Sequence, residues 1–103
     1  MPRKTRDEPP TGFRLVHEPA RLAIMANLHV MEAADFIQLM NETGLSRGNL
    51  SSHMSKLEEA GYITVEKTFA GKTPRTLLSL TGAGREALRE YRRTMEPLIA
   101  ALP

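Results

Sequence analysis

Apolar residues recur with a helical period in four stretches of the chain, and with a period of two between the third and the fourth. The first helical stretch is predicted to start at Pro19, because proline at the first helical position loses no hydrogen bond. It is expected to end near His29 or Val30 and carries an apolar stripe formed by Leu22, Ala23, Met25, Ala26 and Leu28. Residues 1–12 hold prolines and charged side chains with little to bury, which predicts a disordered basic tail before one domain over 13–103.

Two short helices with a tight turn between them are predicted next. Asp35 is a suitable N-cap for a helix over 36–43, and Gly44 suits its C-terminal end. Ser46 is expected to cap a third helix over 46–60. The second helix offers four apolar side chains to a core: Phe36, Ile37, Leu39 and Met40. This order is typical of a helix-turn-helix.

Beyond the third helix the pattern becomes that of a β-hairpin. A first strand is indicated by Ile63, Val65 and Phe69, which alternate with polar residues. Residues 70–74 read as a turn and Thr76–Leu80 as the second strand.

The hairpin is followed by a long final helix. Thr81 is its expected N-cap and the helix extends from Gly82 to about residue 101, with Pro97 predicted to kink or restart it. A link over 32–34 leaves room for one small additional strand. The predicted fold is therefore α+β and mostly helical, with a three-helix core, a β-hairpin and a C-terminal helix.

The third helix combines a narrow apolar face with a face of short polar side chains. On a helical wheel the apolar face holds Leu50, Met54 and Leu57, with Arg47 and His53 at its flanks. The opposite face carries Gly48, Asn49, Ser52, Ser55 and Lys56, and only its last turn is acidic. A plain solvent-facing helix is one explanation, although long residues such as Glu, Lys and Gln are commoner there. Short donors and acceptors would instead let the helix approach base edges in a DNA major groove.

Charge is segregated along the chain, although the formal net charge is only +2. Two windows, 43–57 and 67–85, contain six of the 14 basic residues and none of the 12 acidic ones. The hairpin turn is part of the second window and carries Lys72, with Arg75 just beyond it. Such segregation indicates a surface that faces a polyanion, unless these charges merely solvate loops.

Several other kinds of chemistry lack a sequence basis. The chain contains no cysteine, which excludes disulfides, thiolate metal sites and cysteine nucleophiles. Its histidines, His17, His29 and His53, stand far apart and are better explained as capping, core-edge or DNA-facing residues than as metal ligands. No catalytic constellation, signal peptide or membrane span emerges. We therefore expect a cytoplasmic, nucleoid-associated binding protein that is not an enzyme and needs no cofactor or metal.

Three segments together resemble a known family. They are HEPARLAIMANL, LSRGNLSSHMSKLEEAGYI and KTFAGKTPRTLLSLTGAGREAL, and they cover most of the run from Arg21 to Leu88. This run resembles the winged helix-turn-helix transcriptional regulators, near the ArsR and MarR groups and especially the small stand-alone winged-helix proteins. The metal-sensing ArsR pattern is not followed, because its thiolate site cannot exist here.

The resemblance implies a homodimer that binds double-stranded DNA and acts on transcription. The helix over about 46–60 would read the major groove, and the wing over about 62–80 would lie on the backbone or in the minor groove. The expected DNA-binding residues are Ser46, Arg47, Asn49, Ser51, Ser52, His53, Lys56, Lys67, Lys72, Thr73 and Arg75.

The final helix supplies a candidate dimer interface. Apolar side chains follow one another at spacings of three and four in a heptad-like seam made of Leu88, Tyr91, Met95, Leu98 and Leu102. The seam exceeds what one small domain needs, so the segment 82–102 is expected to contribute to dimerisation, unless it folds back on its own domain.

Two rival functions remain open from the sequence alone. A winged-helix module could serve protein contacts without binding DNA, although the acid-free face of the third helix argues against this. A dimer interface could also double as a pocket for a small effector.

Overall fold

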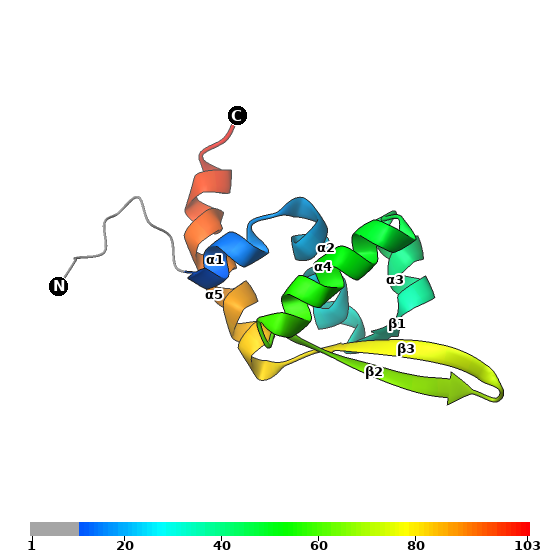
Figure 1. Cartoon of the computed structure of the whole chain (residues 1–103). Helices are drawn as coiled ribbons and strands as arrows, with labels where there is room; N and C mark the ends of the chain where they lie inside the picture. The colour runs from blue at the N-terminus through cyan, green and yellow to red at the C-terminus, as the bar shows by residue number, and fades with distance from the viewer. Residues whose placement is uncertain (1–10) are drawn as a thin grey trace.

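The computed structural model describes residues 11–103, and its helices and strands follow the predicted order with one helix added (Figure 1). The small additional strand for which the link over 32–34 left room is present as β1. The elements are α1 Thr11–Val16, α2 Pro19–Met31, β1 Ala33–Asp35, α3 Phe36–Thr43, α4 Arg47–Glu59, β2 Ile63–Ala70, β3 Thr73–Leu80 and α5 Gly82–Ala100. The mostly helical α+β fold is confirmed. The predicted disordered tail falls on residues outside the described range, except that residues 11 and 12 belong to α1.

The starts of the central helices are fixed by capping side chains, and the sequence suggested two of these caps, Asp35 and Ser46. The Glu18 carboxylate accepts hydrogen bonds from the backbone N–H groups of Ala20 and Arg21 at the start of α2. Asp35 begins α3 with a reciprocal capping box, and Ser46 caps α4. Each cap satisfies N–H groups that have no partner inside the helix, so each boundary is determined locally.

The sheet is antiparallel with the strand order β1-β3-β2. β2 and β3 pair along their whole length and are joined by a two-residue turn, Gly71 and Lys72. The predicted turn over 70–74 was therefore too long. Gly71 has φ 66°, a left-handed conformation that lets so short a turn close.

The core lies where α2, α3 and α4 meet the sheet. Its fully buried side chains are Val16, Ile24, Met25, Leu28, Leu39, Leu50, Leu57 and Leu78. One predicted core position is wrong, because Ile37 is 52% exposed, and Phe69 of the alternating strand pattern is also exposed, at 68%. In α2, Ile24 is buried and Ala26 is exposed, so the buried stripe is rotated slightly from the predicted one.

Helix α1, which the sequence analysis did not predict, packs against α5. The Phe13 ring stacks on the Tyr91 ring at a centroid distance of 5.1 Å, and the Tyr91 hydroxyl lies 2.9 Å from His17 Nδ1. These contacts hold the first half of α5 against the domain.

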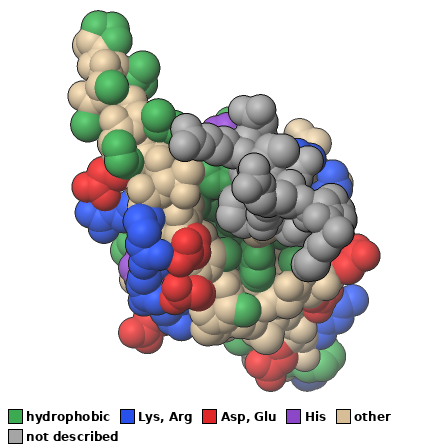
Figure 2. All heavy atoms as spheres, turned by 90° about the vertical axis from the view of Figure 1, so that its left-hand side faces the viewer, with side chains coloured by type: hydrophobic (Ala, Val, Ile, Leu, Met, Phe, Trp, Pro, Cys, Tyr) green, Lys and Arg blue, Asp and Glu red, His purple; other side chains and the backbone are tan. Residues whose placement is uncertain are grey.

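The C-terminal half of α5 projects beyond the rest of the domain (Figure 1). The helix continues through Pro97 without a restart. Hydrophobic side chains gather on the projecting column in Figure 2, and Leu98, Ile99 and Leu102 are between 58% and 67% exposed.

Candidate nucleic-acid interface

Helix α4 presents its short polar side chains to solvent. Leu50 and Leu57 are buried and Met54 is partly buried, so the predicted core face is confirmed. The outward residues Ser46, Arg47, Gly48, Asn49, Ser52, Ser55 and Lys56 are all exposed, and Ser51 is half-buried. A partner could therefore reach the backbone and short side chains of this face without displacing other elements.

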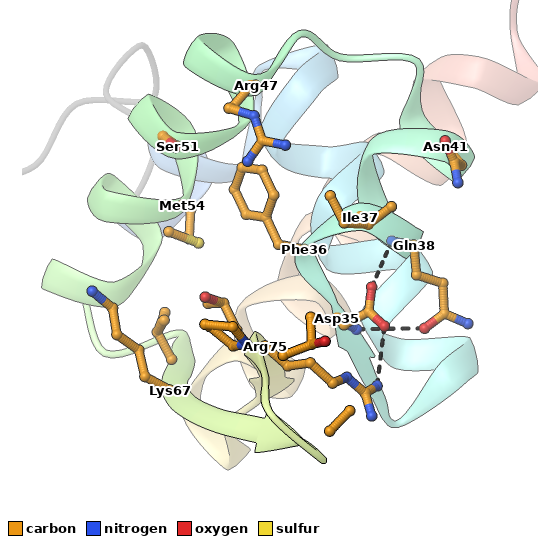
Figure 3. Close-up of a pocket in the computed structure, with 15 residues that line it drawn as sticks. Asp35, Phe36, Ile37, Gln38, Asn41, Arg47, Ser51, Met54, Lys67 and Arg75 are labelled. Atoms are coloured by element: carbon orange, nitrogen blue, oxygen red, sulfur yellow. Dashed lines mark hydrogen bonds and ion pairs between the residues drawn. The ribbon is translucent and has the colours of Figure 1, made fainter.

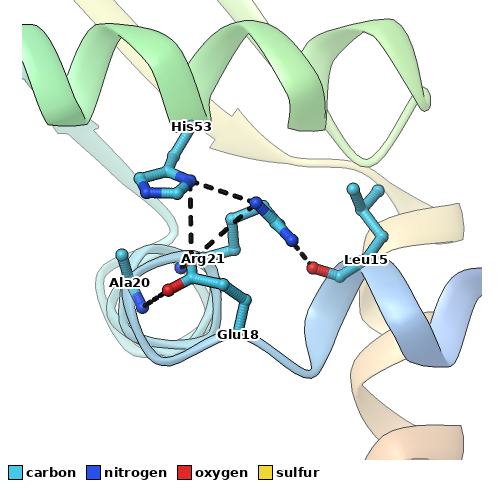
Figure 4. A network of polar contacts seen from close by, with 5 residues as sticks. All are labelled: Leu15, Glu18, Ala20, Arg21 and His53. Atoms are coloured by element: carbon cyan, nitrogen blue, oxygen red, sulfur yellow. Dashed lines mark hydrogen bonds and ion pairs between the residues drawn. The ribbon is translucent and has the colours of Figure 1, made fainter.

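His53, one of the expected DNA-binding residues, lies instead on the side of α4 that faces α2 (Figure 4). Its Nδ1 is 3.2 Å from Arg21 Nη1 and 3.5 Å from Glu18 Oε2. Because an arginine N–H group can only donate, His53 Nδ1 accepts this hydrogen bond. Arg21 Nε also donates to the Leu15 carbonyl at 2.6 Å. The network ties α4 to the start of α2 and engages His53 inside the domain.

The Glu18 carboxylate in this network is kept ionised. Partial burial raises its pKa, but the two backbone N–H donors at the start of α2, together with the neighbouring His53 and Arg21 side chains, outweigh that effect. The pKa of Glu18 is therefore lowered from its ordinary value. An anionic Glu18 therefore caps α2 and also contacts Arg21 and His53 at the junction of α2 and α4.

A broad open groove of about 1040 Å³ separates α4 from the wing, which is the hairpin β2–β3. Figure 3 shows Arg47, Ser51 and Met54 on the α4 side, with Lys67 and Arg75 on the wing side. Helix α3 closes the groove with Phe36, Ile37, Gln38 and Asn41. The groove thus has cations on two walls and a floor that mixes apolar and amide side chains.

Two of the groove cations differ in their contacts. The Arg47 guanidinium carbon stands 5.4 Å from the centre of the Phe36 ring, a cation–π contact that leaves its N–H groups free for other acceptors. Arg75 is engaged, because its Nη2 donates to Asp35 Oδ2 at 3.0 Å. The backbone N–H of Gln38 and then Arg75 lower the pKa of Asp35, and they outweigh partial desolvation.

The other expected wing residues, Lys67, Lys72 and Thr73, are exposed. Lys72 lies in the turn at the wing tip, while Lys67 and Thr73 line the groove. Five of the expected DNA-binding residues therefore line the groove: Arg47, Ser51, Lys67, Thr73 and Arg75. The others, Ser46, Asn49, Ser52, Lys56 and Lys72, are exposed outside its lining, and His53 faces α2.

The expected dimer residues divide into two groups. Leu88 and Tyr91 pack against the domain's own core. Met95 is half-buried, and Leu98 and Leu102 are exposed. A second hollow of about 460 Å³ is lined here by Tyr91, Arg92, Met95, Glu96, Ile99 and Ala100. Only the distal part of the seam is thus available to a partner.

Among residues 11–103, no three His, Asp or Glu side chains are grouped so that they could hold a metal ion. None of the helices in this range has the length and apolarity required to cross a bilayer.

Asp35 and Ile37 belong to this surface although the sequence analysis did not assign them to it. Asp35 was identified only as a helix cap, and its partner Arg75 is 40 residues away in the chain. A helical period shows that Ile37 is apolar but not whether a neighbouring element covers it. Neither role had a local sequence signal.

A helix-turn-helix whose exposed second helix lies beside a cation-bearing hairpin defines the winged helix-turn-helix class of DNA-binding proteins. Residues 20–99 match the model of the family described as winged helix DNA-binding domain, and the chain belongs to that family. The resemblance expected from the sequence is thereby confirmed.

Individual relatives agree with this assignment. An uncharacterised protein of Methanocaldococcus jannaschii is 31% identical over 79 residues, which span 77% of this chain and 86% of the relative. A transcriptional regulator homologue from Pyrococcus horikoshii, whose structure is solved, is 31% identical in sequence and superposes with a TM-score of 0.78. The match covers 84% of this chain and 86% of that one. A MarR-family regulator from Porphyromonas gingivalis shares the fold at 20% identity and a TM-score of 0.72, covering 97% and 100% of the two chains.

Proposed function

We propose that the protein is a sequence-specific regulator of transcription that binds double-stranded DNA as a homodimer. Helix α4 enters the major groove, and the wing contacts the backbone or the minor groove. The observation that carries this proposal is the exposed face of α4, which holds no acidic residue from Arg47 to Leu57, beside a groove with cations on both sides. A protein with this role binds without catalysing a reaction and works at the nucleoid in the cytoplasm.

The first turns of α4 suit close contact with DNA. Gly48 has no heavy atom near its potential Cβ position, and the Ser46 hydroxyl caps the helix by accepting from the Asn49 N–H at 3.2 Å. The helix N-terminus directs backbone N–H groups and the positive end of the helix dipole outward, which favours phosphate. Asn49 and Ser52 then supply the side chains that distinguish bases.

The groove between α4 and the wing suits one phosphate strand. Arg47 on one wall and Lys67 on the other provide cations, and both side chains are exposed. Lys72 extends the positive charge to the wing tip. Contacts of this kind supply affinity and position without sequence choice, whereas α4 supplies the choice.

The projecting end of α5 is the proposed dimer interface. Leu98, Ile99 and Leu102 expose apolar surface that a monomer would leave in water, and Met95 lies at its edge. A second copy of this helix would cover these side chains and place two α4 helices in successive major grooves, about 34 Å apart.

The test is a pair of measurements on the full chain. Sedimentation should show a dimer at micromolar concentration, and selection from random duplexes should recover a palindromic site that the protein binds far more tightly than unselected DNA. Equal binding to selected and unselected duplexes would contradict sequence-specific regulation. Absence of binding to any duplex at two salt concentrations would favour a module for protein contacts instead.

A further inference from the structure

The outer half of the wing lies beyond the part of the sheet that is anchored to the domain. Strand β1 pairs with β3 only at residues 77–79, so within the described range 11–103 residues 73–76 have β2 as their sole neighbouring strand. A two-stranded ribbon in water is marginally stable and twists readily. The angle between the wing and α4 therefore needs a restraint near residue 76.

Such a restraint is present at Asp35, where one carboxylate joins two elements. Its Oδ1 accepts from the Gln38 backbone N–H at 2.8 Å, which anchors the carboxylate at the start of α3. Its Oδ2 accepts from Arg75 Nη2 at 3.0 Å, which anchors the wing. The Gln38 side chain in turn accepts from the Asp35 N–H at 3.4 Å.

The two charged side chains are only partly accessible, with 42% of the Arg75 side chain and 26% of the Asp35 side chain exposed. Figure 3 shows the pair at the boundary between α3 and the wing. If Arg75 left the pair to bind a phosphate, the Asp35 carboxylate would remain beside that phosphate as an unpaired anion. Like charge at short range opposes binding, so the paired geometry disfavours a direct phosphate contact.

We propose that Asp35 and Arg75 form a brace that sets the angle between the wing and the α3–α4 pair, and that Arg75 is a positioning residue for DNA binding. This inference depends on the proposed function, in which α4 and the wing contact the same duplex. The brace keeps Lys72 at the distance from α4 that the duplex requires. It replaces the expectation that Arg75 itself holds a phosphate.

Binding measurements separate a brace from a phosphate contact. Asp35→Asn removes the charge but keeps the helix cap, because Asn caps as well as Asp does. Arg75→Gln removes the other partner, and Lys72→Gln is the matched control for a true phosphate contact. A brace predicts that Asp35→Asn, Arg75→Gln and the double variant each weaken binding by the same factor, about threefold.

Salt dependence is the second readout of the same titrations. The slope of log K against log salt should be unchanged in Asp35→Asn and Arg75→Gln, but smaller by about one in Lys72→Gln. The brace is refuted if Arg75→Gln lowers the slope as Lys72→Gln does, or if Asp35→Asn tightens binding by releasing Arg75.

A distance measurement tests the brace without DNA, so it stays informative if the proposed function fails. The chain has no cysteine, so spin labels at Glu59→Cys on α4 and Lys72→Cys on the wing are unambiguous. Labelled chains are mixed with excess unlabelled protein, which removes distances between subunits. Asp35→Asn should broaden or shift the label–label distance distribution, and an unaltered distribution would overturn the brace.

Discussion

Gly84 lets the first turn of α5 pack directly against the backbone of Tyr62, which lies between α4 and β2. The glycine is buried, and a Cβ atom placed on it would overlap the Tyr62 carbonyl oxygen and lie 2.9 Å from Leu80 Cδ1. The Leu80 side chain can rotate, but the Tyr62 carbonyl cannot, because it accepts the Thr81 N–H at 3.0 Å. Replacing Gly84 by alanine therefore forces a shift of the backbone.

Gly84→Ala should destabilise the protein, because the extra methyl group in a packed core carries a steric cost of about 1–3 kcal/mol. The gain in helix propensity from Gly to Ala, about 0.5–1 kcal/mol, offsets part of this loss. A change of 1 kcal/mol moves the melting temperature of a domain of this size by about 4–8 °C. Circular dichroism melts at one fixed protein concentration measure the effect, because melting of a dimer depends on concentration.

Gly82→Ala is the matched control, two residues earlier in the same helix. Nothing lies within 4 Å of a Cβ atom at Gly82, and the residue is exposed. This variant should melt at the wild-type temperature or slightly above it. The reasoning is refuted if Gly84→Ala is as stable as Gly82→Ala, since the close approach of α5 would then impose no steric limit.

Other expected outcomes concern binding, assembly and pH. Lys72→Gln should weaken binding to all duplexes alike, measured by fluorescence polarisation on selected and unselected DNA; a loss confined to the selected site would contradict this. Asn49→Ala should reduce the favourable binding free energy by about 1–3 kcal/mol and relax the base preference at one position of the site, measured by repeated selection. An unchanged selected motif would count against a reading role for Asn49. Leu98→Glu should give a monomer in sedimentation with little loss of secondary structure, and a persistent dimer would relocate the interface. The folded-state pKa values of Glu18 and Asp35 are lowered, so both carboxylates stabilise the fold above their unfolded pKa values near about 4, and this stability is lost as pH falls through the folded values. The melting temperature should thus fall on acidification, and less steeply for Asp35→Asn; identical slopes would show that the Asp35 carboxylate adds no pH-dependent stability.

Features set by neighbouring residues were predictable from the sequence. The caps at Asp35, Ser46 and Thr81 each use a side chain that bonds a backbone N–H three residues later, so the sequence order alone contains the signal. The face of α4 was predictable for the same reason, because its buried leucines follow the helical period.

Features that depend on distant contacts were not predictable. Helix α1 has only six residues, and its place is fixed by Phe13 and His17 meeting Tyr91 on α5. His53 was expected among the DNA-binding residues, although the helical wheel placed it at the flank of the apolar face, and Arg21, 32 residues earlier, holds it inside the domain. Helical periodicity gives the angle of a side chain around its helix, but not the element that occupies that direction.

The end of α4 and the start of α5 are joined by hydrogen bonds through one short segment. The Tyr62 N–H donates to the Leu57 carbonyl at 3.0 Å, and the Tyr62 carbonyl accepts from the Thr81 N–H at 3.0 Å. The Thr81 hydroxyl donates to the Gly61 carbonyl at 2.7 Å. Because Thr81 is also the N-cap of α5, these bonds couple the proposed reading helix to the proposed dimer helix without a flexible linker. In the proposed dimer, a change in how the two α5 helices pack would therefore move both α4 helices, and the spacing of the DNA half-sites would report the geometry of that dimer.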